Sequence, residues 1–438
     1  SLPLHSTADL REAFLKTRIE GTFLEVNDLV AIRQNVLMVQ SVTTFLLKRD
    51  DIRFGHLKQL ATPVQNFPEV LKRIDTIVNK YGEIKDNAST ELARIRRDIV
   101  KSQSSISRTL HTILRQAQAE GLVEKDTAPT MRDGRLVIPI PAMNKRRIGG
   151  IIHDESATGK TAFVEPSSVV ELNNQLRELE NEERREIIRI LTDATNFLRP
   201  FYPNLLDSTL FLARIDALQA KAKWSIQIKA IKPYLKNTPF VDWFEARHPL
   251  LQLSLEKQHK SIVPLSIKLT QEQRILLISG PNAGGKSVCL KTVGLLQYML
   301  QCGLPIAIHE RSQAGIFEHI FIDIGDEQSI ENDLSTYSSH LLNMKHCIRH
   351  SNARSLLLID EFGTGTEPQI GGAIAEAVLE KFNTNKAYGV ITTHYTNLKH
   401  FASNTEGIVN GAMLYDRHEM RPLFHLQIGN PGSSFAVE

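Results

Sequence analysis

Residues 280–287 read Gly-Pro-Asn-Ala-Gly-Gly-Lys-Ser and have the types and spacing of a phosphate-binding loop. An apolar run at 275–278 precedes them, and a helical pattern at 288–299 follows. In this context glycines let backbone N–H groups face a phosphate, and the helix N-terminus adds partial positive charge. Lys286 is predicted to reach the β- and γ-phosphates of a nucleotide, and the Ser287 hydroxyl to ligate Mg²⁺. A Gly-rich surface turn is the alternative, which the strand–loop–helix pattern disfavours.

Two carboxylates, Asp360 and Glu361, follow the apolar run 356–359 directly. In an open α/β sheet the carboxyl end of a strand faces the ligand. Asp360 is therefore predicted to hold Mg²⁺, directly or through water, and Glu361 to polarise an attacking water. A further β-like run ends at His394, which would bond to a γ-phosphate or that water, although such a His is more often structural.

The composition permits several kinds of partner. The chain has 438 residues, 42% of them hydrophobic and 23% charged, with a net charge of +3. That length suits two to four domains, and the mild basicity allows nucleic acid without indicating it. We find no run of eighteen apolar residues and no signal peptide, so we expect a cytoplasmic protein that contacts no membrane. The chain begins with Ser and ends abruptly, and we expect it to be a piece of a longer protein.

The pattern of apolar residues divides the chain into a helical part and an α/β part. Residues 1–85 are predicted to form a first part of a helical core, and 201–235 a second part. Residues 86–200 are predicted to form two long helices with a small β-module at about 132–166. From 236 to 438 short apolar runs alternate with helical patterns, which favours an α/β domain with a mainly parallel sheet. The predicted fold class is thus multidomain.

The β-module lies between the two long helices in the sequence. The β-like runs 135–140 and 148–152 flank a basic turn at 144–147 and resemble a hairpin, and a third strand is predicted at 161–164. Antiparallel pairing of the helices would bury both apolar stripes and carry the β-module far from the body. A plain long-helix bundle without a functional tip remains the alternative.

Several motifs, unlinked in the chain, together resemble the MutS family of ATPases. The segments are 280–287, 360–366, 392–395 and 335–340. Two others, 324–336 and 153–166, resemble the second bacterial branch of that family, which lacks the mismatch-sensing domain. The resemblance covers nearly the whole chain.

The resemblance implies an ABC-type, P-loop ATPase that uses ATP and Mg²⁺ and works as a homodimer with two shared active sites. The nucleotide would be held by Gly280, Pro281, Asn282, Ala283, Gly284, Gly285, Lys286, Ser287 and Val288. Ser335 and Thr336 would reach the γ-phosphate of the partner's nucleotide, and Gln328 would sense metal and water. His248 lies where the ATPase domain opens, and Ile262 would line the adenine pocket. The mismatch-repair branch often has an aromatic residue there, and the segment 262–264 has none.

The resemblance also makes the long helices levers and the β-module a clamp. Lys145, Arg146, Arg147 and Lys160 would then contact a phosphate backbone. Solubilising charge on turns is the alternative for these residues. No interleaved aromatic pattern supports base reading, so any contact should be independent of sequence and sensitive to salt.

These features favour an ATP-dependent clamp that binds double-stranded or branched DNA and controls recombination. Two alternatives stay open: a ribosome-associated ATPase that splits stalled or collided ribosomes, and a mismatch-repair ATPase. A scaffold without turnover is disfavoured because Lys286, Asp360 and Glu361 are all present. We assign no nuclease activity to these residues.

Overall fold

The computed structural model describes residues 2–5, 8–48, 54–132, 134–281, 284–325, 336–364, 367–416, 418–419 and 421–430. The chain divides into two compact units, Ser1–Ala217 and Leu218–Glu438. The domain boundaries at 85, 200 and 235 stay predictions.

The first unit begins with four helices, α1 (Arg11–Thr17), α2 (Val26–Leu47), α3 (Gly55–Ala61) and α4 (Pro68–Ile77). The backbone N–H of Glu25 donates to the Asp28 carboxylate across the first turn of α2, at 3.1 Å, which satisfies a donor that the helix leaves free. By length and composition alone α2 would pass as a membrane span. In the structure Leu29 and Ile32 of α2 are instead buried in an apolar core with α4, as in the core helix of a globular unit.

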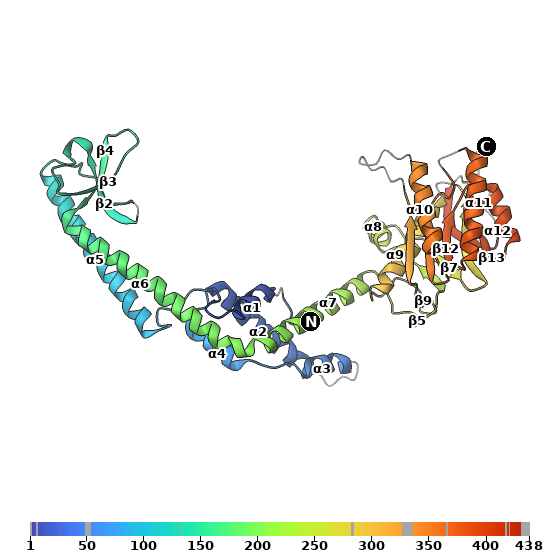
Figure 1. Ribbon diagram of the computed structural model, residues 1–438, viewed down its shortest axis with the longest axis horizontal. Coiled ribbons are helices and arrows are strands. Elements are labelled where there is room, and N and C mark those ends of the chain that lie inside the picture. Colours follow the sequence, from blue (N-terminus) through green and yellow to red (C-terminus); the bar gives the residue numbers. More distant parts are fainter. Residues whose placement is uncertain are drawn as a thin grey trace. The chain divides into compact units, whose positions relative to one another are not determined.

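Two long helices, α5 (Thr90–Ala119) and α6 (Ser167–Leu198), lie side by side (Figure 1). Ser89 caps α5 by accepting the Leu92 N–H at 2.9 Å, and its hydroxyl donates to Glu186 in the C-terminal half of α6 at 2.6 Å. At the other end Leu110 of α5 and Val169 of α6 share one apolar core. The helices therefore run antiparallel, as predicted, and each spans about 45 Å.

The β-module stands at one end of this helix pair (Figure 1). Its strands are β1 (Thr130–Arg132), β2 (Arg135–Pro141), β3 (Gly150–Glu155) and β4 (Thr161–Pro166), and the order in the sheet is β1-β2-β4-β3.

The predicted hairpin between 135–140 and 148–152 is wrong, because β4 lies between β2 and β3 and pairs with both. After β2 the Ala142 N–H donates to the Lys160 carbonyl at 2.9 Å, next to the start of β4. The chain then crosses to the far side of β4, where β3 pairs with it. Gly150 permits the close approach of β3, since a Cβ there would lie 2.1 Å from the Glu165 carbonyl oxygen.

A fully buried carboxylate, Glu165 in β4, joins this sheet to α6. It accepts hydrogen bonds from Arg135 Nη1 at 2.9 Å and from Asn173 Nδ2 at 2.6 Å, and His153 Nε2 lies 2.5 Å away. Arg135 also donates to Asn174 of α6 at 2.9 Å. Burial alone would raise the pKa of Glu165, but the hydrogen bonds from Asn173, His153 and Arg135 outweigh it and hold the pKa below its ordinary value.

The second unit contains a six-stranded sheet in the order β10-β11-β12-β8-β13-β14, parallel except for β14. The strands are β8 (Gln273–Ser279), β10 (His319–Asp323), β11 (Ser355–Ile359), β12 (Tyr388–Thr392), β13 (Gly407–Asp416) and β14 (Arg421–Ile428). The helices are α9 (Lys286–Gln301), α10 (Thr336–His350), α11 (Pro368–Thr384) and α12 (Thr396–Asn404).

Helices cover both faces of this sheet (Figure 1). Leu276 and Ile278 of β8 pack into one core with α9, whereas Ile275 and Leu277 pack into another with α11 and α12. Successive strand residues point to opposite faces, so a continuous apolar run such as β8 requires cover on both sides. The mainly parallel α/β sheet is thus confirmed.

A smaller sheet completes the second unit, in the order β5-β9-β6-β7. Its strands are β5 (Tyr234–Lys236), β6 (Val241–Ala246), β7 (Leu265–Leu269) and β9 (Gln313–Gly315), and α8 (Pro249–Lys257) lies between β6 and β7 in the chain. Helix α7 (Tyr202–Gln227) runs from the first unit into the second.

The Glu165 cluster generates a prediction about acid stability. Glu165→Gln should lower the free energy needed to open the β-module by roughly 3 kcal/mol at pH 7, because it removes the buried carboxylate charge that is paired with the Arg135 guanidinium. The carboxylate's contribution is present above its unfolded pKa of about 4.3 and is lost as pH falls through the lower folded value. The difference from wild type should therefore shrink below pH 4. Hydrogen exchange of the β4 amides measures it.

Glu171→Gln is the matched control, since Glu171 is an exposed glutamate on α6 close to the same cluster. It should leave β4 exchange unchanged. An effect of Glu165→Gln that is equally large at pH 4 and pH 7 would contradict the role assigned to the charge.

Candidate functional site

The turn between β8 and α9 depends on glycines at both ends. Gly280 has φ +140° and Gly285, the N-cap of α9, has φ +92°. A Cβ at Gly280 would lie 3.2 Å from the Met413 carbonyl oxygen, and one at Gly285 would lie 3.0 Å from the Phe424 ring. Both positions therefore combine a left-handed backbone with close packing. The helix that follows begins with Lys286.

The Lys286 ammonium is buried at the mouth of this turn. It donates to the Gly280 carbonyl at 2.6 Å and to the Pro281 carbonyl at 3.2 Å. Burial lowers its pKa to about 8, although the nearby carboxylates of Glu361 and Asp360 favour the charged form. Lys286 is thus a desolvated cation with two carboxylates beside it. A cation of this kind can bind an anionic ligand, and the carboxylates can bind a metal ion next to it.

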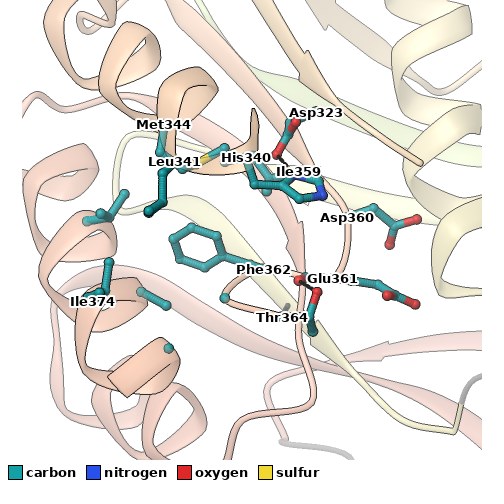
Figure 2. A pocket seen from close by; sticks show the side chains of 14 residues that line it. Asp323, His340, Leu341, Met344, Ile359, Asp360, Glu361, Phe362, Thr364 and Ile374 are labelled. Atoms are coloured by element: carbon teal, nitrogen blue, oxygen red, sulfur yellow. Dashed lines mark hydrogen bonds and ion pairs between the residues drawn. The ribbon is translucent and has the colours of Figure 1, made fainter. Parts of the chain in front are cut away.

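The residues Asp360 and Glu361 follow β11, and Thr392 at the end of the neighbouring β12 holds both. The Thr392 hydroxyl donates to Asp360 Oδ1 at 2.5 Å and accepts the Glu361 N–H at 2.8 Å. Glu361 has φ +48°, a left-handed conformation that is strained for a residue with a side chain. Figure 2 shows both carboxylates extending to one side while Phe362 points the other way, toward Leu341 and Ile374.

His394 lies two residues beyond β12, with its Nε2 atom 3.4 Å from the Lys286 ammonium. Burial, and next the charge of Lys286, lowers the pKa of His394 below its ordinary value. The ring is therefore neutral at pH 7, and a neutral imidazole has one donor and one acceptor nitrogen.

Asp323 and His340 line a small cavity together with Asp360 and Glu361 (Figure 2). The buried Asp323 carboxylate lies 2.8 Å from His340 Nδ1 and accepts Asn343 Nδ2 at 2.9 Å. The Asp323 carbonyl oxygen accepts the Asp360 N–H at 2.9 Å. These bonds hold the backbone of Asp360 in place relative to β10 and α10.

A larger, mainly apolar cavity of about 420 Å³ opens beside the start of α9. Its lining includes His248, Ile262, Gly285, Val288 and Phe424. His248 Nδ1 caps α8 by accepting the Leu251 N–H at 3.3 Å, and burial lowers its pKa, so the ring is neutral. A mainly apolar cavity beside a glycine turn and a helix start has the polarity and size of a site for a flat apolar ring.

The structure thus brings most of the predicted site residues to one region. Gly280, Pro281, Gly284, Gly285, Lys286, Ser287, Val288, Asp360, Glu361 and His394 border the carboxyl end of the sheet, and His248 and Ile262 border the adjoining cavity. Asn282, Ala283, Gln328 and Ser335 lie outside the described residues, and Thr336 is described only as the first residue of α10.

Sequence reasoning missed three contributors to the site. Phe424 enters the cavity from β14, although no aromatic residue was found near Ile262. The motifs 392–395 and 335–340 contain Thr392 and His340, but their sequences do not indicate that Thr392 bridges two carboxylate residues or that His340 contacts Asp323. The useful signal was Asp323 itself, a carboxylate that ends an apolar run just as Asp360 does.

A divalent cation fits these residues through oxygen donors. Half-buried Asp360 and Ser287 supply hard oxygens of the kind that Mg²⁺ prefers. Within the described ranges no group of three or more His, Cys, Asp or Glu side chains forms a metal cage. Mg²⁺ is commonly held by one or two protein oxygens together with substrate phosphates, so the sparse donor set suits it.

Comparison with known proteins shows which sequences this chain resembles. Residues 276–437 match the model of MutS domain V. The whole chain is 38% identical to proteins named Endonuclease MutS2 from Geobacillus sp. and from Levilactobacillus brevis, in each case over 55% of the relative. A protein of the same name from Finegoldia magna is 42% identical over 85% of the chain and 46% of the relative.

The chain therefore spans about half the length of the curated relatives that it matches. The likeness extends over both units, not only over the α/β unit that holds the candidate site. The chain belongs to the MutS family, in the branch of the MutS2 proteins.

Proposed function

We propose that the chain hydrolyses ATP at the carboxyl end of the six-stranded sheet and uses the cycle to control a DNA-binding clamp. The observation that carries the proposal is the meeting of Lys286, Asp360, Glu361 and His394 at one edge, beside a cavity of nucleobase size. A buried cation and N–H groups at a helix start bind phosphate, and carboxylates beside them serve metal and water.

The chemistry assigned to each residue follows from its surroundings. Lys286 would release its bonds to the loop carbonyls and bind the β- and γ-phosphate oxygens, where its charge stabilises the transition state. Glu361 is exposed beyond the strand and can orient a water for in-line attack and accept its proton. Neutral His394 would bond to the γ-phosphate. Asp360 and Ser287 would hold Mg²⁺, which supplies neutralisation of phosphate charge when bound.

The family membership suggests a homodimer in which Ser335 and Thr336 of each subunit complete the site of the partner. We propose that closure of two such sites moves α5 and α6 as levers and the β-module as a clamp. Phosphate contacts from Lys145, Arg146, Arg147 and Lys160 would hold double-stranded or branched DNA. This assigns the protein to recombination control in the cytoplasm, away from membranes.

The main rival is action on stalled or collided ribosomes, because a basic clamp suits ribosomal RNA as well as DNA. A mismatch-repair role would need a base-probing element. Phe163 has the sequence context Phe-x-Glu of such a probe but is buried in the β-module with Arg132 stacked 4.3 Å from its ring centroid. We therefore place mismatch repair third.

Lys286→Ala should reduce ATP affinity or turnover by at least about 100-fold, because the cation lost faces the transferred phosphate. Equilibrium binding of a fluorescent ATP analogue and phosphate release measure the two effects. Lys381→Ala, which removes an exposed lysine from α11, is the control and should change neither. Normal turnover by Lys286→Ala would contradict the phosphate role.

Glu361→Gln should bind ATP with unchanged affinity and lower kcat by about 10²–10⁴-fold, because the amide cannot accept a proton. The nucleotide-bound dimer should accumulate, which light scattering detects. Glu380→Gln, an exposed glutamate of α11, is the matched control. Turnover at the normal rate in Glu361→Gln would show that another group activates water.

The trapped Glu361→Gln protein also separates the two leading substrates. Its ATP-dependent capture from a cell lysate should recover branched DNA if the clamp acts in recombination. Recovery of ribosomal subunits instead would replace DNA by the ribosome in the proposed function and leave the ATPase assignment standing.

Phe424→Ala should raise KM for ATP roughly tenfold and leave kcat nearly unchanged, because loss of base–aromatic stacking costs about 1–3 kcal/mol. Steady-state kinetics provides both constants. Tyr298→Ala, which removes an exposed aromatic side chain from α9, should leave KM as it is. Equal KM values for the two variants would mean that the base does not bind in this cavity.

A further inference from the structure

The turn between β2 and β3 holds an apolar side chain out in solvent. Met143 is 87% exposed, more than any other large apolar side chain in the described part of the chain. The 3₁₀ turn that carries it, Ala142–Asn144, is fixed on both sides. Asn144 Nδ2 donates to the Leu122 carbonyl at 2.9 Å, and the Ala142 N–H donates to the Lys160 carbonyl at 2.9 Å. The protrusion is therefore built by specific bonds on two flanks.

Basic residues surround this methionine. Arg146 and Arg147 follow it and are exposed, and neither has an ion-pair partner among the residues that the structure describes. Lys160 is exposed on the adjoining turn, tied to the same backbone through the Ala142 bond. Lys145 is paired with Glu155 at 2.7 Å, which also anchors the turn to β3. The uncompensated charge near Met143 is thus positive.

The β-module shows no exposed aromatic ring among its described residues. Its exposed large apolar side chains are Met131, Met143, Ile151 and Ile152. Proteins that bind single strands or RNA loops stack bases on aromatic rings. Proteins that deform duplex DNA insert aliphatic wedges, methionine included, between base pairs in the minor groove, with basic residues on the flanking phosphates. The β-module has the second composition.

We propose that Met143 is a wedge that enters the minor groove of duplex DNA and unstacks a base step, while Arg146, Arg147 and Lys160 hold the flanking phosphates. The inference rests on the proposed DNA-binding function and deepens it. Unstacking costs a few kcal/mol per step in a continuous duplex and less where stacking is already broken, at a junction, nick or mismatch. The wedge thus gives a preference for branched or damaged DNA without any reading of base identity.

The test compares Met143→Ala with Met131→Ala, which removes the exposed methionine of β1 in the same module. Affinities are measured for a four-way junction and for a continuous duplex of the same sequence, and bending is measured by energy transfer between the duplex ends. Wild type and Met131→Ala should prefer the junction about tenfold and bend the duplex. Met143→Ala should lose the preference and the bend, and Met143→Leu should restore both.

The salt dependence of DNA affinity separates the contribution of the Met143 wedge from that of the basic residues. Met143→Ala should keep the wild-type slope of log affinity against log salt, whereas Arg146→Ala should reduce that slope by about 1. If Met143→Ala and Met131→Ala behave alike on DNA that wild type binds, the wedge is refuted and the DNA-binding function stands. If wild type binds no DNA at low salt, or binds an RNA stem more tightly with no effect of Met143→Ala, both the wedge and the DNA assignment are refuted.

Discussion

The candidate site depends on the parallel register of three neighbouring strands, β8, β12 and β11. Because their carboxyl ends meet at one edge, Gly280, Thr392 and Asp360 become neighbours although they are far apart in the chain. Thr392 then joins the two carboxylate residues through one hydroxyl. Lys286, the first residue of α9 after β8, lies at the same edge. A shift of register by one residue would turn these side chains to opposite faces.

Two residues of the site are in unfavourable environments. Lys286 is desolvated and Glu361 has a strained backbone, and both are held by hydrogen bonds to neighbouring strands or loop carbonyls. Strain and burial of charged groups concentrate at functional sites, where the surrounding fold imposes them. In the first unit a buried charge has a structural role instead. Glu165 joins three strands of the β-module to α6 through its hydrogen bonds.

The sequence was most informative where a short motif carries its own geometry. The glycine turn after β8, the strand that precedes Asp360 and the two long helices are predictable from the sequence, since each depends on local spacing. Strand partners were not predictable in the same way. The runs that became β2 and β3 have the alternation and the turn of a hairpin, yet the choice of β4 as the common partner depends on Gly150 and on bonds that close only in three dimensions.

Phe424 shows the same limit at the site. It reaches the cavity because β14 pairs with β13 at the edge of the parallel sheet, and nothing in its local sequence marks it as part of this cavity. The Asp323–His340 contact likewise joins the end of β10 to α10, two elements that lie apart in the chain. Roles that arise from one motif could be predicted, whereas roles that arise from the meeting of distant segments required the fold.

Nucleoside triphosphate binding at the shared edge of β8, β12 and β11 underlies every role proposed for the site residues. Hydrogen–deuterium exchange of the chain with and without ATP and Mg²⁺ measures this most directly. Binding at this edge should slow exchange at 279–290, 359–364 and 392–395, and in the cavity segment 260–265. Unchanged exchange in those segments under saturating ATP, or protection confined to other parts of the chain, would contradict it.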